Sequence, residues 1–201
     1  MFLANCSHWI FDMDGTLTKA ANDFDAIRVE LGVPEGKPVL ETIGRFPPEQ
    51  ACRAHSKLAE IELEIATKAV AQPGARKLLL QLRERHAALG LLTRNTAAAA
   101  KETLSVTGLA EFFKDESIVA RETCAPKPNP AGVLYLVEGW KVKADCSVVV
   151  GDYLYDLQAG REAGARTVHF DVTGEFPWPE VTDFAVTDLD QLFALATSKE
   201  T

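Results

Sequence analysis

WIFDMDGTLT, residues 9–18, joins a short apolar run to two aspartates, Asp12 and Asp14, which are followed by a glycine and a threonine. The run from His8 to Phe11 shows no alternation of polar and apolar residues, which is typical of a strand buried on both faces of a parallel sheet. In open α/β sheets, ligands bind just beyond the carboxyl ends of the strands. We therefore interpret residues 9–18 as a buried strand that ends in functional carboxylates.

Short apolar runs recur along the chain and alternate with helical patterns. Three further strands are predicted at residues 87–93 (AALGLLT), 147–150 (SVVV) and 166–170 (RTVHF). Helices are predicted at residues 75–86, 130–140, 157–163 and 188–196, the third ending at Gly164 and the fourth capped by Asp188. The alternation of strand and helix indicates an α/β fold, a Rossmann-like doubly wound parallel sheet.

Residues 19–72 break this alternation, because they contain no convincing strand. We expect a helix with Asn22 as its N-cap that ends at Gly32, a helix over residues 38–43 that ends at Gly44, and a long helix after Pro47 and Pro48. The long helix carries apolar residues at helical spacing: Ala54, Leu58, Ile61 and Ile65. We predict a small inserted α-helical cap at residues 19–72 and a core of residues 1–18 and 73–201. The alternative is that these are simply extra packing helices.

Composition narrows the class of protein. The chain has 201 residues, 47% hydrophobic and 25% charged, which fits one main globular domain. Its net charge of −8, with no basic tract, disfavours a nucleic-acid-binding protein. No stretch approaches the roughly 18 apolar residues of a membrane span, so we expect no membrane partner and a cytoplasmic location. The four scattered cysteines indicate neither a zinc site nor a disulfide framework.

Polar residues follow the ends of the predicted strands. They are Asp12, Asp14, Gly15 and Thr16 after the first, Thr93, Arg94 and Asn95 after the second, and Asp152 and Asp156 after the third, with Lys127 before the helix at 130–140. Each alone has a structural explanation, such as a turn, a helix cap or a solvated charge. Together they gather Asp12, Asp152 and Asp156 at one sheet edge. Two carboxylates about 5 Å apart repel by roughly 3 kcal/mol at an effective dielectric near 20, so this group needs a cation.

A hard cation held by carboxylates is typically Mg²⁺, and such sites commonly take substrate phosphate as well. The Thr93 hydroxyl and the Lys127 ammonium are groups that stabilise a transferring phosphoryl group. Asp12 is placed to act as a nucleophile on phosphorus. Asp14 lies two residues further along, on the same side of an extended chain, so it is placed to act as general acid and base.

Four segments, FDMDGTLT, LLTRN, KPNP and GDYLYD, resemble the four motifs of the haloacid dehalogenase superfamily, specifically its phosphatase branch, and occur in the same order. The resemblance implies that Asp12 is the nucleophile and that Asp14 is the acid/base, with its backbone carbonyl on Mg²⁺. It also implies that Thr93 and Lys127 hold the phosphoryl group, with Arg94 and Asn95 beside it, and that Asp152 binds the metal, supported by Asp156. A helical insertion after the first motif is expected to be a mobile cap, similar to that of phosphoglycolate phosphatases.

The sequence favours a Mg²⁺-dependent phosphatase for a small phosphorylated metabolite and leaves two alternatives. A phosphosugar mutase of the same superfamily keeps both aspartates. A receiver-like signalling domain uses similar strand-end residues, but it has neither Asp14 nor the helical insertion. Candidate cap residues for specificity are Phe24, Arg28 and Arg45. The substrate is not determined, and either a monomer or a homodimer is compatible with the sequence.

Overall fold

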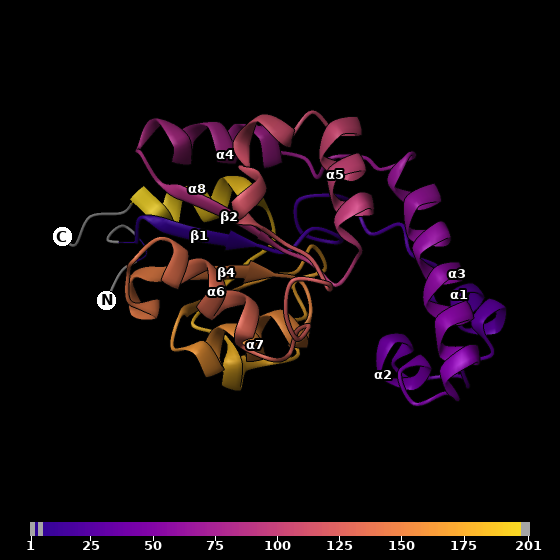
Figure 1. The fold of residues 1–201 in the computed structure, drawn as a ribbon. Helices are drawn as coiled ribbons and strands as arrows, with labels where there is room; N and C mark the ends of the chain where they lie inside the picture. The colour runs from indigo at the N-terminus through magenta and orange to yellow at the C-terminus, as the bar shows by residue number, and fades with distance from the viewer. Residues whose placement is uncertain (1–2, 4–5, 198–201) are drawn as a thin grey trace.

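A parallel sheet forms the centre of the computed structural model, which describes residue 3 and residues 6–197 (Figure 1). The strands are β1 (His8–Phe11), β2 (Ala88–Leu92), β3 (Ile118–Val119), β4 (Ser147–Gly151), β5 (Arg166–Phe170) and β6 (Phe184–Val186). They are arranged in the order β3-β2-β1-β4-β5-β6, and every neighbouring pair is parallel. This is the strand order of a Rossmann-like doubly wound sheet. Successive strands are added outward on one side from β1 to β3 and on the other side from β4 to β6, so the switch point lies between β1 and β4.

Helices cover both faces of the sheet (Figure 1). One face packs against α4 (Ala75–Glu84), α5 (Ala97–Val106) and α8 (Leu189–Thr197), and the other against α6 (Ala131–Gly139) and α7 (Leu154–Ala163). Side chains alternate along β1, so Trp9 and Phe11 join the first apolar layer while Ile10 joins the second. The uninterrupted apolar runs of the sequence follow from this burial on both faces.

Three further helices, α1 (Phe24–Leu31), α2 (Val39–Ile43) and α3 (Pro48–Ala66), lie to one side of the sheet (Figure 1). They have an apolar cluster of their own, which includes Ile27, Leu31, Ile43 and Leu58. Because this cluster is separate from the two layers on the sheet, we refer to residues 19–72 as the cap and to the rest as the core. The boundaries at 18/19 and 72/73 stay predictions.

The chain enters and leaves the cap through two segments that lie side by side. Lys19 N–H donates to the Val70 carbonyl at 2.9 Å, and Gln72 N–H donates to the Leu17 carbonyl at 2.8 Å. Thr18 and Ala71 form an antiparallel bridge between these two bonds. The cap is therefore tied to the core by a short ladder that contains both of its ends.

Several elements differ from the sequence predictions. Asp23 rather than Asn22 caps α1, since its side chain accepts from Ala26 N–H at 3.0 Å. Helix α7 begins at Leu154, before the predicted residue 157, because Tyr153 is the N-cap and Asp156 is the third helical residue. Gly164 ends this helix in the left-handed conformation with φ 82°, as predicted. The Asp188 cap is also confirmed by a bond from Gln191 N–H at 2.8 Å.

Several elements were not predicted from the sequence. They are the strands β3 and β6, helix α5, and the 3-10 turns Ala110–Phe112, Asp115–Ser117, Ala144–Cys146 and Pro179–Val181. Strands of two or three residues offer too few positions for a periodicity. Within the described part of the chain, no helix combines the length and the apolar character needed to cross a membrane.

Candidate active site

The carboxyl ends of β1 and β4 bring three aspartates together, at the point where the strand order reverses. Asp12 continues β1 and donates its N–H to the Val150 carbonyl of β4 at 2.9 Å. Carboxylate oxygens of Asp12, Asp152 and Asp156 all lie within 4.8 Å of one another. The gathering of these three side chains, predicted from their strand-end positions, is present in the structure.

The turn after β1 is built around the backbone of Met13 and Gly15. The Met13 carbonyl accepts from Thr16, Leu17 and Thr18 N–H groups, and Gly15 N–H donates to the Thr18 carbonyl at 2.9 Å. Gly15 has φ 90°, and a Cβ at this position would overlap the Asp152 carboxylate. Glycine is therefore required for both the backbone conformation and the approach of Asp152.

Asp14 points to a different partner from Asp12. Its carboxylate accepts a bond from the Asn95 side-chain amide at 2.8 Å. Burial raises the pKa of Asp14 above its usual range, and the Asn95 bond opposes this rise. Asn95 was predicted to lie beside the phosphate, and the structure gives it a second task, which is to fix the orientation of Asp14.

Lys127 lies buried among the aspartates. Its ammonium forms ion pairs with Asp12 and, at 2.5 Å, with Asp156. Burial alone would lower the pKa of Lys127, but the two carboxylates outweigh it and hold the pKa above its usual value. A permanently charged ammonium is thus fixed next to a carboxylate oxygen of Asp12.

One lysine does not neutralise three carboxylates. Burial, followed by repulsion from Asp12, raises the pKa of Asp152 to about 8 and that of Asp156 to about 6. Burial also raises the pKa of Asp12, against the opposing charge of Lys127. A site that resists holding all its negative charge, and that presents only hard oxygen donors, fits Mg²⁺. The Asp14 carboxylate is outside the three, consistent with the ligand role implied only for its backbone carbonyl.

The β2 end contributes Thr93, Arg94 and Asn95. The buried Thr93 hydroxyl accepts from Asn95 N–H at 3.1 Å and still has a proton to donate. Arg94, predicted to lie beside the phosphate, makes more hydrogen bonds within the protein than that role requires. It donates to the Lys127 carbonyl at 2.6 Å and to both oxygens of Glu41, in the cap, at 2.8 and 3.0 Å.

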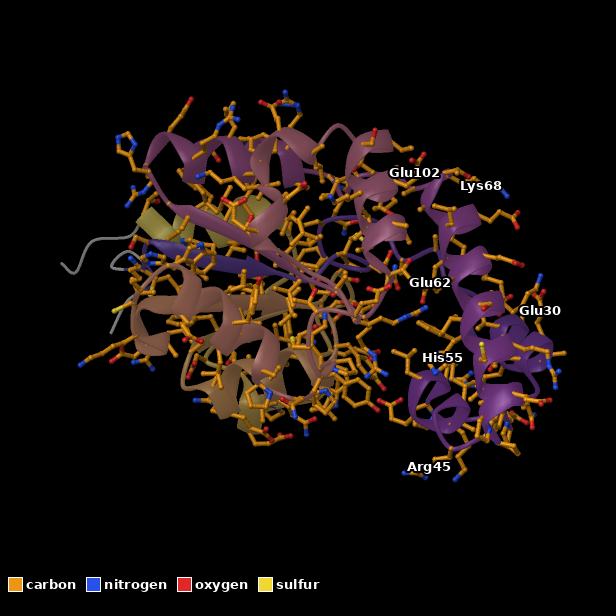
Figure 2. The ribbon with its side chains drawn as sticks, viewed as in Figure 1. Glu30, Arg45, His55, Glu62, Lys68 and Glu102 are labelled. Atoms are coloured by element: carbon orange, nitrogen blue, oxygen red, sulfur yellow. The ribbon has the colours of Figure 1, made fainter. Side chains whose placement is uncertain are left out.

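A cavity of about 370 Å³ lies between these core residues and the cap. All the predicted site residues line it: Asp12, Asp14, Thr93, Arg94, Asn95, Lys127, Asp152 and Asp156. Of the three cap residues considered from the sequence, Phe24 and Arg28 line the cavity and Arg45 does not. Figure 2 shows Arg45 at the outer edge of the cap.

Glu62 is a cavity residue that the sequence analysis missed. It extends from α3 toward the core (Figure 2), where it pairs with Arg121 at 2.5 Å and accepts from Thr96 N–H at 3.1 Å. A signal was present in the sequence, because Glu62 interrupts the buried stripe of Ala54, Leu58 and Ala66 at four-residue spacing. A carboxylate on an apolar stripe indicates a buried partner.

Comparison with known proteins identifies the family of the chain. The family described as haloacid dehalogenase-like hydrolase matches residues 9–170. The chain is 30% identical to a haloacid dehalogenase-like hydrolase domain-containing protein of Arabidopsis thaliana, over 92% of this chain and 77% of that protein. It is 30% identical to a phosphoglycolate phosphatase of Pseudomonas savastanoi pv. phaseolicola, over 79% of this chain and 67% of that enzyme.

Among solved structures, a hydrolase from Pseudomonas syringae superposes with a TM-score of 0.78 at 24% identity, over 96% of this chain and 100% of that one. This structural likeness supports the fold, and the sequence matches support membership of a hydrolase family. The chain belongs to the haloacid dehalogenase-like hydrolases, and it is a phosphatase-like enzyme of that family.

Proposed function

We propose that the protein is a Mg²⁺-dependent phosphatase that hydrolyses a small phosphate monoester through an aspartyl-phosphate on Asp12. The observation that carries the proposal is the division of labour between the two aspartates after β1. Asp12 lies with Lys127, Asp152 and Asp156, whereas Asp14 is turned to Asn95. One carboxylate is thus available to phosphorus and the other to a proton.

In the first half-reaction a carboxylate oxygen of Asp12 bonds to phosphorus as the ester P–O bond breaks. Asp14, whose pKa is raised by burial, gives its proton to the departing alkoxide. Lys127 and the Thr93 hydroxyl stabilise the equatorial phosphoryl oxygens. Mg²⁺ bound at the aspartates would offset their charge and that of the phosphoryl group.

In the second half-reaction Asp14 takes a proton from water, and the resulting hydroxide attacks phosphorus. The bond between phosphorus and Asp12 breaks, which releases inorganic phosphate and restores the Asp12 carboxylate. The cap limits access of bulk water and of large phosphoproteins to the cavity, so we expect a small metabolite as substrate.

The test is a phosphate-release screen over small phosphate esters, with and without Mg²⁺, using the wild-type protein and Asp12→Asn. We expect turnover that depends on Mg²⁺ and falls by at least about a thousandfold in Asp12→Asn, because the nucleophile is lost. Lys77→Gln, which breaks an exposed ion pair with Asp190, is the matched control and should keep full activity. Retained turnover in Asp12→Asn would overturn the mechanism.

A parallel assay of phosphosugar isomerisation separates hydrolysis from the mutase alternative. Hydrolysis predicts free phosphate and no isomerised ester, whereas a mutase predicts the reverse.

A further inference from the structure

The cap side of the cavity is largely apolar. Phe24, Ile27, Leu40 and Leu58 contribute to this wall, together with Pro38 and Val39. Phe24 is notable because its side chain lines the cavity and yet is 54% exposed. A phosphate group would not bind to such a wall, since its oxygens need the polar and charged groups that the core residues provide. The wall therefore faces the alcohol part of an ester bound with its phosphorus at Asp12.

The cations that line the cavity, within the described residues, are Arg28, Arg94 and Lys127, and each already has anionic or carbonyl partners. Lys127 pairs with Asp12 and Asp156. Arg28 pairs with Asp25 at 2.6 Å and donates to the Lys37 carbonyl at 2.9 Å. A second anionic group on the substrate would therefore find no lining cation that is not already engaged by a carboxylate or a carbonyl of the protein.

Of the three cations, Arg94 has the most extensive contacts with other groups of the protein. Glu41 engages it through both carboxylate oxygens, the Lys127 carbonyl takes a further bond, and the Tyr155 ring lies under the guanidinium at 4.8 Å. A guanidinium whose two terminal nitrogens both donate hydrogen bonds, and whose face stacks on an aromatic ring, is fixed in orientation. Glu41 thus balances the positive charge that Arg94 would otherwise offer to the cavity.

We propose that the substrate is a phosphate monoester of an uncharged alcohol with an apolar face, and that Glu41 determines this specificity by occupying Arg94. The inference rests on the proposed function and adds the substrate class to it. Phe24 and its apolar neighbours bind the alcohol. Glu41 discriminates against esters that carry a second negative charge.

The test compares three alkyl esters with similar leaving groups: benzyl phosphate, propyl phosphate and 2-phosphoglycolate. For the wild type we expect kcat/KM for benzyl phosphate to exceed that for 2-phosphoglycolate by at least about tenfold, the scale of discrimination that a few apolar contacts supply. Phe24→Ala should bring benzyl phosphate to within about threefold of propyl phosphate, because the ring loses its contact surface.

The sharper variant is Glu41→Gln, which keeps the shape of the side chain and removes its charge. Because the positive charge of Arg94 is then no longer balanced by Glu41, kcat/KM for 2-phosphoglycolate should rise by about tenfold, with benzyl phosphate changed by less than about threefold. Glu41→Ala repeats the measurement with a different side chain. Glu30→Gln is the control, since Glu30 pairs with Lys57 within the cap and should leave the ratio unchanged.

The possible outcomes distinguish a wrong substrate class or a wrong role for Glu41 from a wrong phosphatase function. Phosphate release that is fastest from 2-phosphoglycolate in the wild type overturns the substrate class and leaves the phosphatase standing. An unchanged preference in folded Glu41→Gln and Glu41→Ala overturns the role of Glu41. Absence of phosphate release from any ester, with Mg²⁺ present, overturns the proposed function itself.

Discussion

Lys127 is the residue on which the charge balance of the site depends. It is buried and paired with two buried carboxylates, one directly after β1 and one in α7. Removing one partner of such a cluster leaves charge in a medium that solvates it poorly, and this costs more than the pairing contributes. Lys127 therefore supports the folded core, in addition to the phosphate-binding role proposed for it.

We predict that Lys127→Ala lowers the free energy of unfolding by about 3 kcal/mol at neutral pH without Mg²⁺ and abolishes phosphate release. The physical cause is the unpaired charge left on Asp12 and Asp156. Urea denaturation measures the first effect, and the ester assay measures the second. Lys77→Ala, at an exposed pair with Asp190, should change stability by less than about 1 kcal/mol. Equal losses in the two variants would contradict the argument.

Site residues could be predicted from the sequence where their position at the end of a strand decides where they lie. Asp12, Thr93 and Asp152 follow apolar runs directly, so the geometry of a parallel sheet brings them together. Glu41 and Glu62 could not be found in this way. Their partners, Arg94 and Arg121, lie in the core, and the pairing depends on how the cap docks. Local patterns carry no information on that docking.

Helix α6 shows how closely an element packs on the sheet. Gly132 faces β2, and a Cβ there would overlap the Leu92 side chain and come within 3.3 Å of Val119. Gly139, in the same helix, has nothing within 4 Å of an added Cβ. The two glycines therefore serve different purposes, one a close approach and the other only the end of a helix.

We predict opposite effects of alanine at these two positions. Gly132→Ala should destabilise the protein by about 1–3 kcal/mol, because Leu92 must move in a packed interior. Gly139→Ala should stabilise it by about 0.5 kcal/mol, because alanine loses less backbone entropy in a helix. Thermal unfolding of both variants tests this, and destabilisation by Gly139→Ala would show that the helix end is more constrained than described.

Among the strands, length and uniform burial decided which could be predicted. β1, β2, β4 and β5 have four or five residues with continuous burial, and all four were predicted. β6 has three residues with an exposed Ala185 at its centre, and β3 has two. Such strands form because a neighbour is already in place, which is tertiary information.

For the molecule as a whole, stability without metal should depend on pH through the aspartate cluster. Asp152 and Asp156 have pKa values of about 8 and about 6 in the folded protein. The folded state therefore binds more protons than the unfolded state above pH of about 4, the range in which free aspartate has already ionised. The free energy of unfolding then falls as pH rises through this interval.

We predict that metal-free protein loses stability from pH 5 to pH 8, and that Mg²⁺ restores it most strongly at pH 8. At a concentration of about 100 times its Kd, Mg²⁺ should add about 2.7 kcal/mol. Denaturation at several pH values, with and without Mg²⁺, measures both effects. Asp152→Asn should be more stable than the wild type without metal at pH 8 and should respond less to Mg²⁺. A wild-type stability that rises with pH would contradict the prediction.

The buried pair of Glu62 and Arg121 should hold the cap against the core. We predict that Glu62→Gln raises KM and increases the rate of proteolysis between the cap and the core, because Arg121 loses its buried partner. Glu64→Gln, on the same helix, breaks an exposed pair with Lys68 and should do neither. Limited proteolysis together with steady-state kinetics gives the comparison, and identical behaviour of the two variants would remove the pair as a cap contact.

The ladder formed by Lys19, Val70, Leu17 and Gln72 has a consequence for the history of such a chain. Because the two ends of residues 19–72 meet at one place, a core in which Leu17 and Gln72 were joined by a tight turn would keep the same strand directions. The closure entropy of an insertion grows only slowly with its length, so a larger or smaller module would fit at the same junction. The core and the cap are thus free to diverge separately, by exchange of a single contiguous segment.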